Sequence, residues 1–254
     1  MDLQARLQVA KQAAFVSGDE LRRHFDSGRG VREAVLDAGQ AQRASLDAIT
    51  VFLSQIYPDE PLWGRGFGET PPGKTFWLVD PLNGADGFKT GDERYATTVA
   101  WVENGQPLIG VVSLPSRRHL YWAIQGGGAK YQDRTLAVRS AGSLEDSVVE
   151  VVIGSQPHRA ASLQALTAVA RFAYQVTAHV SPALGICSVA EATRDAFIGH
   201  ELHAWDWVAA KLILEEAGGQ MTDLEGQPMK LGSPSGLASH PKHHANFLKH
   251  LSQG

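Results

Sequence analysis

The sequence has little of three features that would assign it to a specialised class of protein. Its 254 residues contain a single cysteine, Cys187, which excludes an internal disulfide and a zinc site built from several thiolates. No stretch approaches the roughly 20 consecutive apolar residues that a membrane-spanning helix needs. Residues 1–12 are charged and amphipathic, unlike a signal peptide. We therefore expect a cytoplasmic protein that is not held in a membrane.

An excess of positive charge is also absent. The chain has 23 Lys and Arg residues against 27 Asp and Glu residues, which gives a formal net charge of −4. The basic residues are scattered, so no basic patch indicates binding to nucleic acid. Hydrophobic residues make up 43% of the chain, which is enough for the packed core of an enzyme-sized protein. A small-molecule partner is the expectation that remains.

The first half of the chain combines helical and strand patterns. Apolar residues recur at helical spacing in 3–14 and 46–56, which predicts two helices. Short β-rich runs then follow at 75–79, 97–102, 108–113 and 120–124. The pair Asn104-Gly105 between two of these runs is typical of a type I′ hairpin turn. These patterns predict an antiparallel sheet that ends at the glycine-rich segment 125–128.

The second half alternates strands and helices. Strands are predicted at 148–153 and 174–180, and helices at 160–172, 183–193 and 207–217. Gly218 and Gly219 end the last of these helices. We divide the chain into an N-terminal α+β half, residues 1–140, and a C-terminal α/β half, residues 141–254. The predicted fold class is α+β, with both halves layered on sheets.

Three acidic residues stand at the ends of predicted elements. Glu69 follows a glycine-rich segment, Asp80 follows a strand directly, and Asp206 precedes a helix. Carboxylates in such places are the oxygen ligands that Mg²⁺ prefers. Each also has a simpler explanation, because Asp206 suits a helix N-cap, Asp80 suits a turn, and Glu69 suits an exposed loop. From the residues alone both interpretations stay open.

Two separated motifs resemble the signatures of the inositol monophosphatases and the related bisphosphate nucleotidases. Residues 77–88, Trp-Leu-Val-Asp-Pro-Leu-Asn-Gly-Ala-Asp-Gly-Phe, resemble the central signature, an apolar strand followed by Asp-Pro-hydrophobic-Asp-Gly-Thr. Residues 205–219 resemble the second signature, in which Trp-Asp precedes a helix ending in Glu-Ala-Gly-Gly. Residues 105–115 and 236–240 match the strands expected between and after them. The resemblance implies a layered α/β/α/β/α sandwich of the inositol monophosphatase and fructose-1,6-bisphosphatase type, and a homodimer.

The resemblance also implies a reaction and a set of site residues. The reaction is Mg²⁺-dependent or Mn²⁺-dependent hydrolysis of a small polar phosphate, such as an inositol, sugar or nucleotide phosphate. We place the family's Gly-Glu motif at Gly68-Glu69. The implied metal ligands are Glu69, Asp80, the Leu82 carbonyl and Asp206, and the implied phosphate and substrate contacts are Asn83, Gly84, Ala85, Ser181 and His203.

Several positions depart from the family pattern. Asn83 stands where the family has an aspartate, Ala85 where it has a threonine, and Gln42 where it has a water-activating aspartate. Together with Glu69 and Asp80, these three residues occupy the positions that the resemblance implies are catalytic. The departures predict weak binding at the second metal site and weakened activity. The alternative is a catalytically degenerate member that binds a ligand or a protein partner.

Two further expectations concern compensation for the missing groups. Asp37, Asp47 and Asp86 are the candidates that would replace the missing carboxylate. If the loss is local, the joint substitutions Asn83→Asp, Ala85→Thr and Gln42→Asp would restore metal affinity and activity.

Overall fold

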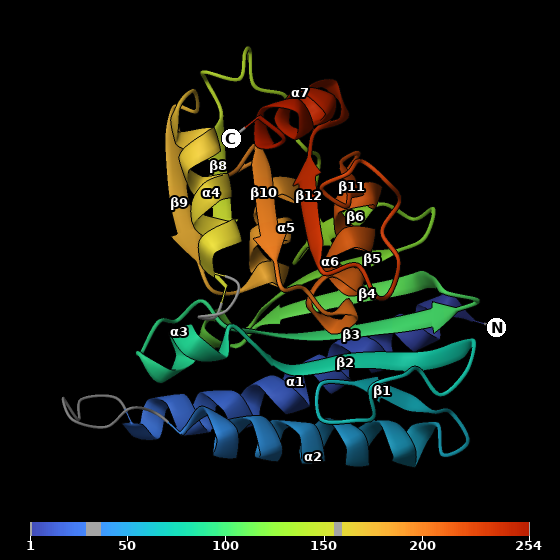
Figure 1. Ribbon diagram of the computed structural model, residues 1–254. Coiled ribbons are helices and arrows are strands. Elements are labelled where there is room, and N and C mark those ends of the chain that lie inside the picture. The colour runs from blue at the N-terminus through green and yellow to red at the C-terminus, as the bar shows by residue number, and fades with distance from the viewer. Residues whose placement is uncertain (1, 29–36, 155–158, 254) are drawn as a thin grey trace.

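The computed structural model describes residues 2–28, 37–154 and 159–253, which form two β-sheets with helices around and between them (Figure 1). The chain begins with two long helices, α1 (Leu3–Gly28) and α2 (Ala38–Ile56), which lie side by side. Asp37 caps α2, because its Oδ1 accepts a hydrogen bond of 2.9 Å from the N–H of Gln40. Within the described ranges, no helix combines the length and apolarity needed to span a membrane.

The first sheet has seven strands in sequential order. They are β1 (Leu62–Gly64), β2 (Thr75–Asn83), β3 (Ala96–Glu103), β4 (Gln106–Leu114), β5 (His119–Ile124), β6 (Ala129–Tyr131) and β7 (Arg134–Thr135). The short helix α3 (Ala85–Lys89) follows β2, and the 3₁₀ helix η1 (Pro115–Arg117) follows β4. All neighbouring strands are antiparallel except β1 and β2, which are parallel.

The second sheet has five strands in the order β11-β12-β10-β8-β9. They are β8 (Val148–Val152), β9 (Gln175–His179), β10 (Ala196–His200), β11 (Gln220–Thr222) and β12 (Ser235–Ser239). The helices of this half are α4 (Arg159–Ala170), α5 (Pro182–Ala190), α6 (Ala204–Glu216) and α7 (Pro241–Leu251). Strand β8 is parallel to both of its neighbours, β9 and β10, whereas β12 is antiparallel to β10.

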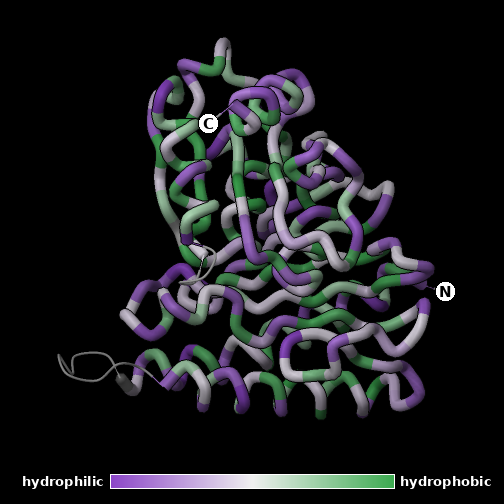
Figure 2. Tube along the Cα trace, viewed as in Figure 1, coloured by the Kyte–Doolittle hydropathy of each residue, from purple (hydrophilic) through white to green (hydrophobic). Residues whose placement is uncertain are grey.

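The two faces of the first sheet pack against different helices because strand side chains alternate between faces. Trp77 and Val79 belong to the hydrophobic cluster between the sheet and helices α1 and α2. Phe76 and Leu78 belong to the hydrophobic cluster between the sheet and helices α5 and α6. The outer face of the second sheet is covered by α4 and α7. Hydrophobic segments run along the strands of both sheets (Figure 2). The predicted α/β/α/β/α sandwich is therefore confirmed.

The structure confirms one expectation about the first sheet, corrects another, and adds a strand that was not predicted. The hairpin turn is confirmed, since Asn104 and Gly105 have φ values of 50° and 77°. The sheet, however, does not end at 125–128, because β6 and β7 continue it. The three residues of β1 were not predicted, because so short a strand has no detectable periodicity. This missed strand positions one side of the candidate site.

Candidate ligand-binding site

The site begins at an irregularity in β2. The register with β3 shifts between Asp80 and Asn83, where Pro81 lacks the N–H that a regular ladder requires. The Pro81 carbonyl instead accepts hydrogen bonds from Ser45 Oγ at 2.9 Å and Thr97 Oγ1 at 3.3 Å. The Asp80 side chain is fully buried, and its Oδ1 accepts a 3.2 Å hydrogen bond from the N–H of Leu82. The bulge therefore fixes a buried carboxylate where the two sheets meet.

A second carboxylate comes from the start of α6. Asp206 is the third residue of this helix, and its Oδ2 accepts a 2.8 Å hydrogen bond from the N–H of His203. Thr98 Oγ1 donates to the Trp205 carbonyl at 2.9 Å, which attaches the start of α6 to β3. Asp206 is only 4% exposed. The two halves of the chain thus each contribute one buried carboxylate.

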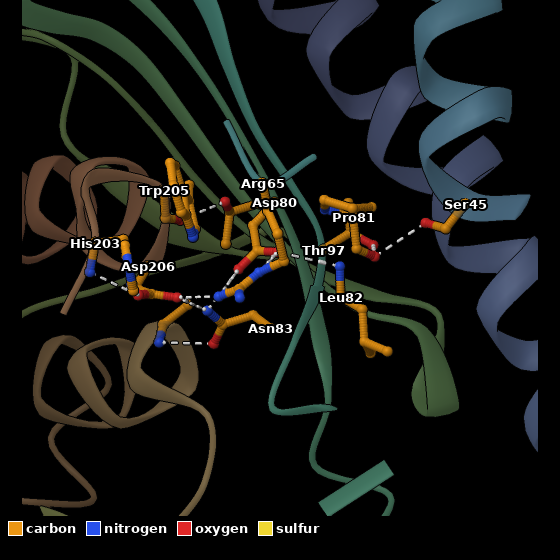
Figure 3. Close-up of polar contacts among 12 residues, drawn as sticks. Ser45, Arg65, Asp80, Pro81, Leu82, Asn83, Thr97, His203, Trp205 and Asp206 are labelled. Carbon is orange, nitrogen blue, oxygen red and sulfur yellow. Dashed lines mark hydrogen bonds and ion pairs between the residues drawn. The ribbon is translucent and has the colours of Figure 1, made fainter. Parts of the chain in front are cut away.

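The side chain of Arg65 lies between these two carboxylates (Figure 3). Its Nε is 2.9 Å from Asp80 Oδ1, and its Nη2 is 3.4 Å from Asp80 Oδ2 and 3.0 Å from Asp206 Oδ1. Hydrogen bonds between ionised partners are roughly twice as strong as neutral ones. One guanidinium therefore joins both acids of the cluster.

Gly64 explains why Arg65 reaches this position. It has a φ of 142°, and a Cβ built on it would lie 1.8 Å from the Val79 carbonyl oxygen. The backbone of β1 can therefore approach β2 this closely only with glycine at that position. The next N–H, that of Arg65, donates to the same Val79 carbonyl at 3.2 Å. The side chain of Arg65 consequently starts beside Asp80, the residue after Val79.

Asn83 completes the cluster with its amide group. Its Nδ2 donates to Asp80 Oδ2 at 3.0 Å and to Asp206 Oδ1 at 2.9 Å. Its Oδ1 accepts from Ser181 Oγ at 2.7 Å and from the N–H of Ala183 at 3.1 Å. Both hydrogens of the amide thus bind carboxylates, which an aspartate at this position could not do.

Burial and charge shift the pKa values of Asp80, Arg65 and His203. Burial raises the pKa of the Asp80 carboxyl, and the Arg65 guanidinium opposes that rise. The charge of Asp80 raises the pKa of Arg65 still further above its ordinary value, so the arginine stays charged. A hydrogen bond with Asp206 raises the pKa of His203, whose Nδ1 is 3.5 Å from Asp206 Oδ2.

A pocket of about 270 Å³ opens onto the cluster. Its lining comes from both halves of the chain and includes Arg65, Leu82, Gly84, Ala85, Asp86, Val180, Pro182, His200, His203 and Asp206. The ring of His203 stacks on Trp205 with a centroid separation of 4.8 Å and an interplanar angle of 9°. One wall of the pocket is therefore formed by His203, which is held in place by stacking on Trp205.

The structure brings most of the predicted site residues together. Asp80, Asn83 and Asp206 form the cluster, Ser181 bonds to Asn83, and Leu82, Gly84, Ala85 and His203 line the pocket. Glu69 does not join them, because it is exposed in the loop between β1 and β2. Gln42 is half-buried on α2 and is not among the lining residues of the pocket.

The proposed compensating acids do not enter the cluster either. Asp37 caps α2, and Asp47 is exposed on the same helix. Asp86 lines the pocket, but its side chain is 77% exposed and lies 3.1 Å from Lys89 Nζ. Each of these three acids therefore has a surface position or a local structural role.

The position expected for a ligand after β1 is held by a different residue from Glu69. The residue that follows β1 and contacts Asp80 is Arg65, whereas Glu69 lies four positions further along the chain, in the exposed loop. Sequence reasoning missed Arg65 because it searched this segment for a carboxylate. In the structure, Gly64 at the end of β1 pairs with Val79, which places the next residue, Arg65, beside Asp80.

The cluster does not fit the Mg²⁺ or Mn²⁺ that the resemblance implies. Mg²⁺ needs oxygen ligands in octahedral geometry, but both carboxylates here already bind a guanidinium and an amide N–H. In the part of the chain that the structure describes, no group of three His, Cys, Asp or Glu side chains could hold a metal ion. With both carboxylates ionised, Arg65 reduces the formal charge of the cluster from −2 to −1, which weakens its attraction for a cation.

Comparison with known proteins agrees with this fold. The family model described as "Inositol monophosphatase family" matches residues 2–254. A fructose-1,6-bisphosphatase/inositol-1-monophosphatase of Aquifex aeolicus is 30% identical over 237 residues, which cover 89% of this chain and 88% of that protein. An inositol-1-monophosphatase of Mesorhizobium japonicum is 32% identical over 242 residues, with coverage of 92% and 91%.

Solved structures show the same architecture. An inositol monophosphatase from Anabaena (Nostoc) sp. superposes with a TM-score of 0.89 at 22% identity, covering 100% of this chain and 97% of that one. Fold, sequence and the position of the cluster between the sheets lead to one assignment. This chain belongs to the inositol monophosphatase family.

Proposed function

We propose that this chain binds a small polar phosphate ester in the pocket between its sheets, and that Arg65 takes the place of the family's catalytic cation. Hydrolysis would then be lost or greatly weakened. The observation that carries this proposal is the position of the Arg65 guanidinium, in contact with both Asp80 and Asp206. Members of the family are phosphatases that generally use Mg²⁺.

The pocket and the relatives support this proposed ligand class. The relatives from Aquifex and Mesorhizobium are named for sugar and inositol phosphates, whose shared chemistry is a phosphate ester on a small polar body. A pocket of about 270 Å³ has room for a molecule of that size. The contacts of Arg65 with the acids use Nε and Nη2, and Nη1 carries two more N–H donors. Arg65 therefore presents N–H donors at the pocket wall, and its charge offsets one of the two carboxylate charges beside it.

Arg65 supports binding better than it supports hydrolysis. A bound divalent cation polarises the phosphate and lowers the pKa of a water molecule so that hydroxide forms near neutral pH. A guanidinium can stabilise negative charge, but it neither coordinates water nor accepts a proton at any ordinary pH. Ala85 also lacks the hydroxyl that the family pattern has at this position. The chain thus keeps an anion contact and loses its means of generating a nucleophile.

The second candidate is a Mg²⁺-dependent phosphomonoesterase with a weakened metal site. Family membership and the presence of Asp80 and Asp206 favour it. For this function Arg65 would have to leave the carboxylates before a cation could enter. Separating one partner from a buried ion pair costs on the order of 3–5 kcal/mol, which the metal would have to supply.

One experiment separates these candidates. Inositol, sugar and nucleotide monophosphates are tested for binding by thermal shift and for phosphate release, each in Mg²⁺, in Mn²⁺ and in EDTA. The proposal expects at least one ligand to raise the melting temperature equally in all three buffers, without phosphate release. The conservative variant Arg65→Lys should keep part of that shift, and Arg65→Gln should lose it. Turnover in Mg²⁺ that EDTA abolishes would instead favour the phosphomonoesterase.

A further inference from the structure

A second polar pocket surrounds a buried glutamate on the second sheet. Glu150 is the central residue of β8, whose other four residues are valines. Its side chain is only 2% exposed. Val149 and Val151 pack on the face that α4 and α7 cover, so Glu150 projects from the opposite face, toward α5. An acid at this position costs free energy unless other groups compensate its burial.

Gly185 on α5 provides the space for this side chain. A Cβ at position 185 would lie 2.6 Å from Glu150 Oε1 and 2.4 Å from Phe197 Cδ2. In the sheet, Glu150 lies between Phe197 of β10 and Thr177 of β9. Helix α5 can therefore pack this closely against Glu150 and Phe197 only because position 185 has no side chain.

The pocket beside Glu150 has a volume of about 300 Å³. Three arginines from separate segments line it, namely Arg94 before β3, Arg117 in η1 and Arg194 after α5. Leu114 and Leu184 form an apolar part of the wall. The remaining lining residues are Glu93, Ser116, Tyr121, Ser188 and Thr193. Cationic groups beside an apolar wall are suited to a small organic anion.

Arg194 and Arg94 both act on Glu150, and each lowers the pKa of its carboxyl. Arg194 Nε lies 3.7 Å from Glu150 Oε2, whereas the Arg94 guanidinium is also held by Asp92 at 2.6 Å. On α5, Gly185 lies against the carboxyl and Ser188 lines the pocket beside it. Burial is the largest influence and raises the pKa of Glu150 to about 7.

The formal charges of the lining change when Glu150 is protonated. The three lining arginines and the two lining glutamates, Glu93 and Glu150, have a combined formal charge of +1. Asp92 pairs with Arg94, and including its negative charge makes the total zero. A proton on Glu150 raises the sum to +1. It also frees the Arg194 guanidinium from its nearest carboxylate. The protonated pocket is therefore the better anion site.

We propose that this pocket is a second ligand site, which binds a small organic carboxylate on Arg194 and Arg117 and takes up a proton on Glu150 as it does so. The apolar part of the ligand lies against Leu114 and Leu184. This site is separate from the pocket at Arg65, since the two lining sets share no residue. By linkage, an anion that favours the protonated carboxyl binds more weakly as the pH rises through the pKa of that carboxyl.

The test is calorimetric titration of the full chain with benzoate at pH 6, 7 and 8. The charge of benzoate is constant over this range, unlike that of phosphate. The protonated fraction of a carboxyl with a pKa of about 7 falls about tenfold between pH 6 and pH 8. We therefore expect the wild-type affinity to fall about tenfold, with proton uptake visible as a dependence on buffer ionisation heat. Glu150→Gln should bind equally at all three pH values, near the wild-type affinity at pH 6.

Three further variants locate the site. Arg117→Gln should weaken binding at every pH, whereas Arg118→Gln, its exposed neighbour paired with Asp19, should not. His203→Gln, in the other pocket, should leave benzoate binding unchanged. The proposal is overturned if benzoate shows no saturable binding at pH 6, if Glu150→Gln keeps the wild-type pH dependence, or if His203→Gln abolishes binding.

Discussion

Arg65 Nη2 lies 3.0 Å from Asp206 Oδ1, although the two residues are 141 positions apart in the chain. Arg65 follows β1 of the first sheet, and Asp206 belongs to the first turn of α6 in the second half. The ion pair therefore joins the two halves at the place where the family's catalytic site is expected. The guanidinium there contacts a carboxylate from each half.

Arg65 should be important for stability. Replacement by methionine leaves Asp80 and Asp206 buried without their cationic partner, which typically costs about 3–5 kcal/mol. Urea denaturation at pH 7 measures this loss. The matched control is Arg118→Met, which removes an exposed ion pair with Asp19 and should cost at most about 1 kcal/mol. Equal effects of the two substitutions would contradict the structural role of Arg65.

Asn83→Asp should destabilise the protein as long as Arg65 is present. The substitution replaces two donated hydrogen bonds by a third carboxylate beside Asp80 and Asp206. We expect a lower melting temperature at pH 7 and partial recovery at pH 5, because protonation of one carboxyl relieves the repulsion. Added Mg²⁺ should not restore the melting temperature. A variant as stable as the wild type at pH 7 would show that the cluster tolerates the extra charge.

Gly64→Ala tests whether the close approach of β1 to β2 positions Arg65. A methyl group at this position would meet the Val79 carbonyl, and alanine also disfavours a φ of 142°. The strained backbone alone costs about 1–3 kcal/mol, so the free energy of unfolding should fall by at least that amount. Gly68→Ala in the same loop is the control, since no atom lies within 4 Å of its added methyl group. Equal stability of the two variants would refute this explanation.

His244 should make stability depend on pH. It is buried, its two ring nitrogens lie 2.8 Å from Thr222 Oγ1 and Ser239 Oγ, and burial lowers its pKa to about 4. The unfolded chain binds the proton from about pH 6.5 downward, whereas the folded protein binds it only near pH 4. The stabilising contribution is therefore complete above pH 6.5 and is lost as the pH falls toward 4.

The size of this effect is up to about 3 kcal/mol, at 1.36 kcal/mol for each unit of pKa. Urea denaturation at pH 7, 6 and 5 should show a decline in wild-type stability that is smaller in His244→Gln. Parallel pH profiles for the two proteins would exclude His244 as the cause.

Much of the fold could be predicted from sequence because local signals agreed with it. Apolar periodicity located α1 and α2, and the turn residues Asn104-Gly105 located the β3–β4 hairpin. The signatures around Asp80 and Asp206 placed two elements of the site, since such motifs combine a strand end with a helix start. These features depend on residues that are neighbours in the chain.

The content of the site could not be predicted in the same way. Glu69 was expected among the ligands because it follows a glycine, but the strand that enters the site ends five residues earlier, at Gly64. The contact of Arg65 with Asp206 depends on tertiary packing between distant segments. The joint substitutions Asn83→Asp, Ala85→Thr and Gln42→Asp would leave this guanidinium in place. Restored metal binding therefore also requires a change at Arg65.

The most direct test of the account is calorimetric titration with Mg²⁺ of three proteins: the wild type, Asn83→Asp, and the double variant Arg65→Glu with Asn83→Asp. The account predicts no saturable Mg²⁺ binding across the millimolar range for the wild type or for Asn83→Asp, because both retain the guanidinium between Asp80 and Asp206. The double variant, which supplies carboxylates in place of that cation, should bind Mg²⁺. Saturable Mg²⁺ binding by the wild type, at an affinity that the double variant does not improve, would contradict the claim that Arg65 replaces the metal.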